Sequence, residues 1–263
     1  MLGNAPAIST PLVGLQLWTV REEAAADLRA VLDVAAGAGY DGVEFAGYHN
    51  HSPAEISEML RNSGQRAAGT TAGLADFEGD WERVLDDASA IGSPFIAFPW
   101  MEEKLRTRHG FEHLADLLSM RAPGAAARGI RLLYHVHGYE FSDLGGSTGI
   151  QILEQRCAQD VVAIQPDTYW VASAGIDPLA FLTERCGHCP SIHLKDASDR
   201  QSMEDTEAGS GTLGIPAIVG KAVECGTEWL IVEQEKFSIA PFESIAISQR
   251  NIRGMLAGSW GNA

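Results

Sequence analysis

Side chains that commonly bind metal ions recur at the ends of four apolar segments of this sequence. The four segments and their polar side chains are residues 131–137 with His135 and His137, 162–167 with Asp167, 191–196 with His193 and Lys195, and 230–235 with Glu233 and Glu235. Imidazole nitrogens combined with carboxylate oxygens suit divalent ions such as Mn, Zn and Fe. The set therefore predicts a metal site rather than four unrelated polar residues of a core.

The spacing inside these segments is that of β-strands whose polar side chains share one face. Successive side chains of a strand point to opposite faces. His135 and His137 therefore point one way, and the apolar Tyr134 and Val136 point the other way. Glu44, in the strand-like segment 42–46, follows the same rule. We expect the polar faces to meet in one interior and the apolar faces to pack against helices.

The whole chain shows eight strand-like segments in regular alternation with eight helical ones. The predicted strands are residues 13–18, 42–46, 66–73, 94–100, 131–137, 162–167, 191–196 and 230–235. The predicted helices begin near residues 27, 53, 80, 110, 147, 177, 215 and 241, and Pro123 is expected to kink or interrupt the fourth. Such alternation indicates a parallel sheet. Eight repeats in about 250 residues predict a single α/β domain, a (β/α)8 TIM barrel spanning residues 1–263.

Composition narrows the classes of partner. The net charge of −16 argues against nucleic acid and against an anionic membrane surface, because both require clustered Lys and Arg. No run of about 18 apolar residues occurs, and Met1–Pro11 has no signal-peptide pattern. The four cysteines are too few for a disulfide scaffold, which predicts free thiols and a cytoplasmic protein. A homo-oligomer is compatible with the sequence, which does not determine the number of subunits.

Five motifs carry a resemblance to a known family. They are residues 14–21 (GLQLWTVR), 42–48 (GVEFAGY), 134–137 (YHVH), 192–196 (IHLKD) and 231–234 (IVEQ). In this order they resemble the sugar phosphate isomerase/epimerase family of the xylose isomerase-like TIM barrel superfamily. The resemblance implies one divalent metal held by a Glu, Asp, His, Glu set on strands five to eight. Asp167, His193 and Glu233 match the last three members, and His135 stands where many relatives carry Glu. Where ketose epimerases tend to have a further His, this chain has Trp170.

Other polar residues of the predicted rim have two interpretations each. Glu140 competes with His135 as the fourth ligand. His137 is either a general base, since imidazole titrates near pH 6.5, or a hydrogen-bonding partner of the site. Glu44 binds a substrate hydroxyl or forms a buried ion pair with Lys195. The predicted substrate-binding residues are Glu44, Trp100, Glu140, Trp170 and Lys195.

These residues predict an enzyme that uses one divalent metal ion (Mn, Zn, Mg, Fe or Co) on a small sugar, keto-sugar or cyclitol. The expected reaction is isomerisation or epimerisation through a metal-stabilised enediolate, with His137 or Glu233 moving the proton. The alternative is a dehydratase or lyase acting on an inosose or a 3-keto-glycoside at the same site. A second alternative is a non-catalytic barrel used as a subunit or binding module. The Cys186–Cys189 pair is expected on the opposite face of the barrel, away from this chemistry.

Overall fold

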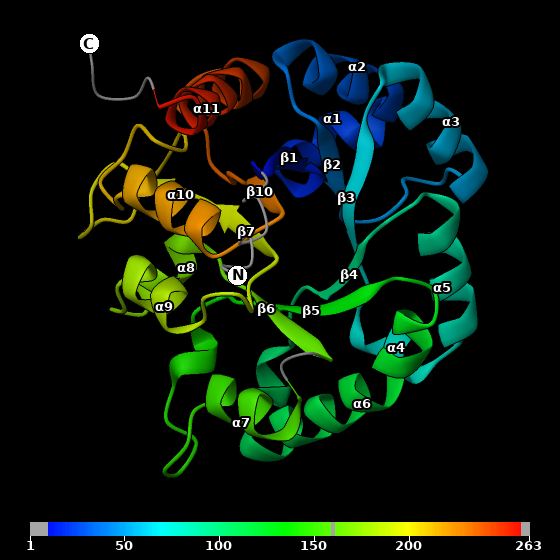
Figure 1. Ribbon diagram of the computed structural model, residues 1–263, viewed down its shortest axis with the longest axis vertical. Coiled ribbons are helices and arrows are strands. Elements are labelled where there is room, and N and C mark those ends of the chain that lie inside the picture. The colour runs from blue at the N-terminus through cyan, green and yellow to red at the C-terminus, as the bar shows by residue number, and fades with distance from the viewer. Residues whose placement is uncertain (1–9, 159–160, 259–263) are drawn as a thin grey trace, which may run out of the picture.

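Eight parallel strands form a nearly closed barrel in the computed structural model, which describes residues 10–158 and 161–258 (Figure 1). Most of the Met1–Pro11 stretch, and with it the prediction about a signal peptide, lies outside these residues. The strands are β1 (Leu12–Gln16), β2 (Gly42–Phe45), β3 (Arg66–Thr71), β4 (Phe95–Phe98), β5 (Arg131–His135), β6 (Val162–Gln165), β7 (Ser191–Leu194) and β10 (Trp229–Val232). Their order is β6-β5-β4-β3-β2-β1-β10-β7. The predicted barrel is confirmed.

The seam of the barrel lies between β6 and β7. A single parallel bridge pairs Asp167 with His193 there, and the His193 N–H donates to the Pro166 carbonyl at 2.8 Å. Two of the predicted metal ligands thus sit where the sheet closes.

Helices surround the barrel, as Figure 1 shows. They are α1 (Arg21–Ala26), α2 (Leu28–Ala38), α3 (Pro53–Ser63), α4 (Leu74–Glu78), α5 (Trp81–Ala90), α6 (Arg108–Ala126), α7 (Gly149–Arg156), α8 (Thr168–Ser173), α9 (Pro178–Glu184), α10 (Ile215–Glu224) and α11 (Pro241–Leu256). Three short 3-10 helices also occur: η1 (Leu17–Val20), η2 (Glu103–Leu105) and η3 (Tyr139–Phe141). The expected one helix per strand was too simple, because α1, α4 and α8 occupy connections that follow strands β1, β3 and β6. Pro123 lies inside α6 without ending it.

The local signals for helix starts were reliable. Ser52 caps α3, with its hydroxyl accepting from the Glu55 N–H at 3.3 Å, while Glu55 accepts from the Ser52 N–H at 2.7 Å. Asp177 caps α9, immediately before Pro178. These contacts involve residues at most three positions apart, which is why the sequence alone revealed them.

Strand parity divides the buried apolar residues into two layers. The inner layer fills the barrel with Ala68, Phe95, Ala97, Leu133, Trp229 and Ile231. The outer layer, which includes Tyr134, Val136 and Leu230, belongs to the larger core between the strands and the helices. Two positions beyond Leu133 on the same face comes His135, and two beyond Ile231 comes Glu233. The inner apolar layer is therefore the floor under the predicted site.

The cysteine prediction was wrong for two of the four residues. Cys186, just after α9, forms a disulfide with Cys225, at the end of α10, while Cys157 and Cys189 are free and buried. The two helices lie side by side (Figure 1). Because 39 positions separate the two cysteines, their pairing depends on this packing and has no local signal. The disulfide also removes the basis on which a cytoplasmic location was predicted.

Within residues 10–158 and 161–258, no helix combines the length and the apolar character needed to cross a lipid bilayer.

Candidate active site

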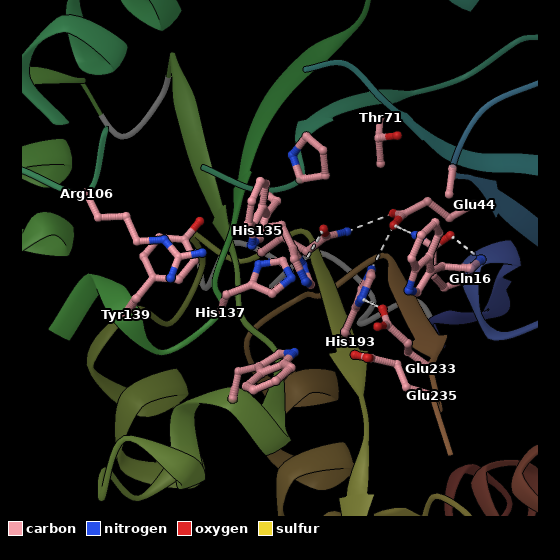
Figure 2. Close-up of a pocket in the computed structure, with 16 residues that line it drawn as sticks. Gln16, Glu44, Thr71, Arg106, His135, His137, Tyr139, His193, Glu233 and Glu235 are labelled. Carbon is pink, nitrogen blue, oxygen red and sulfur yellow. Dashed lines mark hydrogen bonds and ion pairs between the residues drawn. The ribbon is translucent and has the colours of Figure 1, made fainter. Parts of the chain in front are cut away.

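A cavity of about 700 Å³ opens at the carboxyl ends of the strands (Figure 2). Its lining residues are Gln16, Trp18, Glu44, Ala46, Thr71, Pro99, Trp100, Arg106, His135, His137, Tyr139, Gln165, Trp170, His193, Glu233 and Glu235. They come from β1, β2, β3, β5, β6 and β7 and from the segments that follow the strands. This is the end of a TIM barrel where catalytic groups gather.

Four buried residues at this end could hold a metal ion. His135, Asp167, His193 and Glu233 each offer one ligand atom, and these atoms lie within 4.8 Å of one another. The Oδ1 atom of Asp167 accepts from the Trp170 N–H at 2.9 Å, capping α8. Its Oδ2 atom is buried and has no hydrogen-bond partner within the described part of the chain. A buried carboxylate oxygen left without a donor is a costly arrangement, and a cation would satisfy it.

The charged groups of this cluster shift one another's pKa values. Burial raises the pKa of Asp167 to about 7, against the opposing charge of Lys195. Burial would also raise the pKa of Glu233, but the hydrogen bond and charge of His193 lower it to about 2. Burial would lower the pKa of His193, yet Glu44 and Glu233 raise it to about 10. His193 is therefore a cation held between two carboxylates.

The hydrogen bonds of His193 indicate which of its two ring nitrogens could bind a metal ion. Nδ1 lies 2.7 Å from Glu233 Oε2, inside the candidate ligand group, and Nε2 lies 2.8 Å from Glu44 Oε1. Glu44 holds the Nε2 proton, so Nδ1 is the nitrogen that could be exchanged for an ion. A histidine ligand whose second nitrogen donates to a carboxylate is the usual arrangement in metal sites.

Glu44 also determines the tautomer of His135, through Gln165. The Gln165 amide nitrogen donates to Glu44 Oε2 at 2.8 Å, because a carboxylate can only accept. The Gln165 carbonyl oxygen, 3.0 Å from His135 Nδ1, must then accept the Nδ1 proton. The free lone pair of His135 is left on Nε2. Gly69 makes room for this carboxylate, since a Cβ there would lie 2.9 Å from Glu44 Oε2.

His137 lies beside this group and has a different environment. Its ring centroid is 4.6 Å from that of His135 and 5.7 Å from that of Trp170. Burial lowers the pKa of His137 to about 4, so the ring is neutral at physiological pH and can accept a proton. Its Nδ1 and the Trp170 Nε1 are both buried, and neither has a hydrogen-bond partner among the described residues. Both atoms remain available to a ligand in the cavity.

Comparison with known proteins identifies the family. The sequence profile of the family described as Xylose isomerase-like TIM barrel matches residues 32–255. The chain belongs to this family. No curated protein sequence matches it.

Solved structures share the fold of this xylose isomerase-like barrel at low sequence identity. A sugar phosphate isomerase/epimerase from Parabacteroides distasonis superposes with a TM-score of 0.80 at 19% identity, covering 96% of each chain. The probable 3-DHS dehydratase AsbF from Bacillus anthracis has a TM-score of 0.74 at 12% identity and covers 92% of this chain and 98% of its own. The IOLI protein with a bound zinc atom has a TM-score of 0.74 at 14% identity, covering 95% of this chain and 99% of its own.

Glu140 is not placed as predicted in this xylose isomerase-like barrel. Its side chain is fully buried and does not line the cavity. Its carboxylate accepts from the Tyr134 hydroxyl at 2.8 Å and from the His137 backbone N–H at 3.0 and 3.1 Å. Glu140 therefore lies outside both the cavity lining and the candidate ligand group, whereas the sequence predicted it as a metal ligand or a substrate contact. Glu140 lies in η3, and its carboxylate holds the backbone of His137 instead.

Lys195 and Glu44 do not form the predicted ion pair. The Lys195 ammonium pairs with Glu235 and lies 4.7 Å from the Trp170 ring centroid, outside the cavity lining. Glu44 does line the cavity, but its oxygens are occupied by Gln16, Gln165 and His193. Trp100 and Trp170 line the cavity, as a substrate-binding role requires.

Several cavity residues escaped the sequence analysis. Gln16 and Gln165 are the last residues of β1 and β6 and point to the inward face, so strand parity in the sequence is the signal that indicates them. Arg106 directly follows η2 in the connection after β4, and Tyr139 begins η3 in the connection after β5. No local pattern indicates where such segments point.

Proposed function

We propose that this protein is a divalent-metal-dependent isomerase or epimerase of a sugar, keto-sugar or cyclitol. One observation carries the proposal. Of the four buried side-chain atoms without hydrogen-bond partners among the described residues, two belong to residues that line the cavity, His137 Nδ1 and Trp170 Nε1. A third, Asp167 Oδ2, belongs to the candidate ligand group, whose other three members line the cavity. Unsatisfied buried polar atoms are rare and costly in folded proteins. Their concentration here supports a site built to receive a cation and a polar ligand.

His135, Asp167, His193 and Glu233 would hold the ion, which agrees with their donor types and mutual distances. A divalent ion there would polarise a carbonyl and a neighbouring hydroxyl of the substrate and so acidify the C–H between them. The zinc of the structurally similar IOLI protein is consistent with this role for the fold.

The protein's own groups would move the proton and orient the substrate. His137 is neutral, with a free Nδ1, and would accept the proton from carbon and return it to the adjacent carbon. The Trp170 Nε1–H would donate to a substrate hydroxyl. Glu44 and Gln165 would keep both histidine rings in the orientation that the site needs.

A dehydratase or lyase on an inosose or 3-keto-glycoside is the second candidate. It is favoured by His135, which stands where a ligand carboxylate would otherwise be, so that the neutral His137 would act as the base beside the metal group. Epimerisation requires proton transfer on two faces of one carbon, whereas elimination needs one base and a leaving group. The fold shared with a probable dehydratase is compatible with this.

The test is metal content combined with solvent exchange. Protein purified without chelators should hold close to one equivalent of Mn, Zn, Mg, Fe or Co. It should then exchange a substrate C–H for deuterium with at least one member of a panel of ketoses, keto-sugars and inososes. Exchange with retention of all substituents supports the isomerase or epimerase, while release of water or of an aglycone supports the lyase. Protein that takes up no metal would favour a non-catalytic barrel.

A further inference from the structure

The cavity has carboxylates at one end and an arginine at the other. Three carboxylate residues that line it, Glu44, Glu233 and Glu235, lie on one side in Figure 2, around His193. Arg106 lies on the other side, beyond His137, and is the one Lys or Arg in the lining. Within the described parts of the chain, no carboxylate forms an ion pair with Arg106. In a protein of net charge −16, an arginine in the cavity would be expected to pair with a carboxylate. Because Arg106 does not pair with one among the described residues, its role is not that of a structural ion pair.

The backbone of Met101 fixes this arginine in place. The Arg106 Nε–H donates to the Met101 carbonyl at 2.9 Å. The Met101 N–H donates to the Tyr139 hydroxyl at 2.8 Å, and the guanidinium carbon lies 3.9 Å from the centroid of that ring. The centroid of the Trp100 ring lies 5.2 Å from the same guanidinium carbon. With Nε engaged and the plane held on an aromatic ring, the two terminal nitrogens form a preorganised fork.

A continuous row of rings connects this fork to the metal end. The Tyr139 ring stacks on His137 at 6.0 Å with an interplanar angle of 12°. The ring centroid of His137 lies 4.6 Å from that of His135, and the His135 centroid lies 4.3 Å from that of His193. A ligand lying along this row would contact the metal group at one end and the guanidinium at the other.

We propose that Arg106 is a specificity residue for an anionic substituent, so that the substrate is a sugar or cyclitol carrying a carboxylate or a phosphate. The placement of the carbonyl end at the metal group rests on the proposed function. The recognition of the anion by Arg106 does not, because it depends only on the fork held by Met101 and Tyr139. A planar fork whose terminal N–H groups have no hydrogen-bond partner in the described part of the chain matches both oxyanions.

The experiment compares charged and neutral probes of the same skeleton. Binding of D-fructose 6-phosphate is measured against D-fructose, and binding of D-glucuronate against D-glucose, by isothermal titration calorimetry with and without Mn²⁺. Wild-type protein should bind at least one anionic probe more tightly than its neutral partner. Arg106→Gln should lose about 10- to 100-fold of that affinity, the usual loss for a charge-assisted hydrogen bond, and leave the neutral sugars unchanged. The pair that responds tells phosphate from carboxylate.

Two further variants separate recognition from folding. Arg106→Lys keeps the charge but loses the fork, and should recover part of the affinity. Arg108→Gln removes the same charge two residues away, outside the cavity lining, and should change nothing. Equal affinity for charged and neutral probes, or an equal loss in both classes with Arg106→Gln, overturns the inference. Mn²⁺ binding is recorded in the same titrations, so a protein that binds anions through Arg106 but takes up no metal overturns the proposed function alone.

Discussion

The Nε2 atom of His193 lies 2.8 Å from Oε1 of Glu44, a residue 149 positions earlier in the chain. The same carboxylate accepts from Gln16 at 2.6 Å and from Gln165 at 2.8 Å. Glu44 is thus the acceptor on which the orientation of both candidate histidine ligands depends. Its contribution is to position those rings, although it also lines the cavity.

Replacing Glu44 with Gln should weaken metal binding about 10- to 100-fold, as is typical for loss of an outer partner of a ligand. A glutamine has one acceptor oxygen and cannot receive three N–H groups, so the histidine rings lose their fixed tautomers. Calorimetric titration with Mn²⁺ and Zn²⁺ measures the loss. Glu58→Gln, which removes an exposed carboxylate on α3, is the matched control. Unchanged affinity in Glu44→Gln would mean that the rings need no such support.

The variant Asp167→Asn should lose metal more severely than Glu44→Gln while its fold survives. Asparagine can still accept the Trp170 N–H and cap α8, whereas alanine would also cost about 1 kcal/mol of helix capping. Two measurements test this. The first is the metal content after dialysis, and the second is the melting temperature of the metal-free protein. Asp177→Asn, at the equivalent capping position of α9, should keep its metal. A full equivalent retained by Asp167→Asn places the metal elsewhere.

His137→Gln should retain the metal but reduce turnover by about 10²- to 10⁴-fold, the contribution of a general acid or base. Exchange of the substrate C–H with deuterated solvent should fall in parallel. His135→Ala should show the opposite pattern, with weak metal binding that excess metal partly overcomes. The exposed His109 supplies a control, because His109→Gln should leave both properties unchanged. If the phenotypes of His135 and His137 are exchanged, the roles assigned to them are exchanged too.

Reducing the Cys186–Cys225 disulfide should lower the free energy of unfolding by about 4 kcal/mol, the value that chain entropy gives for a loop of 39 residues. Metal content and activity should stay the same, since neither cysteine lines the cavity. Chemical denaturation of Cys186→Ser with Cys225→Ser, beside wild type with and without reductant, tests this. The single variant Cys157→Ser controls for loss of a thiol. If reductant does not change the unfolding free energy of the wild-type protein, and four thiols can be titrated in it, the disulfide does not form.

Cys189 should make the protein less stable in alkali. Burial raises the pKa of its thiol to about 12, while in the unfolded chain it titrates near 9. Between these values the unfolded state loses a proton that the native state keeps, so stability falls as pH rises from about 9 toward 12 and this contribution is constant below 9. Urea denaturation across pH 8–11, compared with Cys189→Ala, measures the slope. The same thiol should resist iodoacetamide at pH 8 until the protein unfolds. Rapid labelling of native protein would show that the thiol is accessible.

The arrangement of strands, and the polar residues they carry to the rim, could be predicted from the sequence. Strand parity is a local property with a period of two, so the sequence alone predicts that His135, His193 and Glu233 point into one interior. Helix caps such as Ser52 are equally local. The same parity would also have indicated Gln165, which follows Ala163 on the inward face.

Contacts between distant segments were decided only when the barrel closed. Gln165 reaches Glu44 across the interior, Cys186 meets Cys225 where two helices pack, and Lys195 finds Glu235 rather than Glu44. Glu140 is buried within η3, and Arg106 enters the cavity from a segment without periodicity. The sequence determined which residue types stand at the ends of the strands, because that depends on neighbours in the chain. The tertiary structure decided which of them touch, because partners of a buried charge are chosen by distance and desolvation in three dimensions.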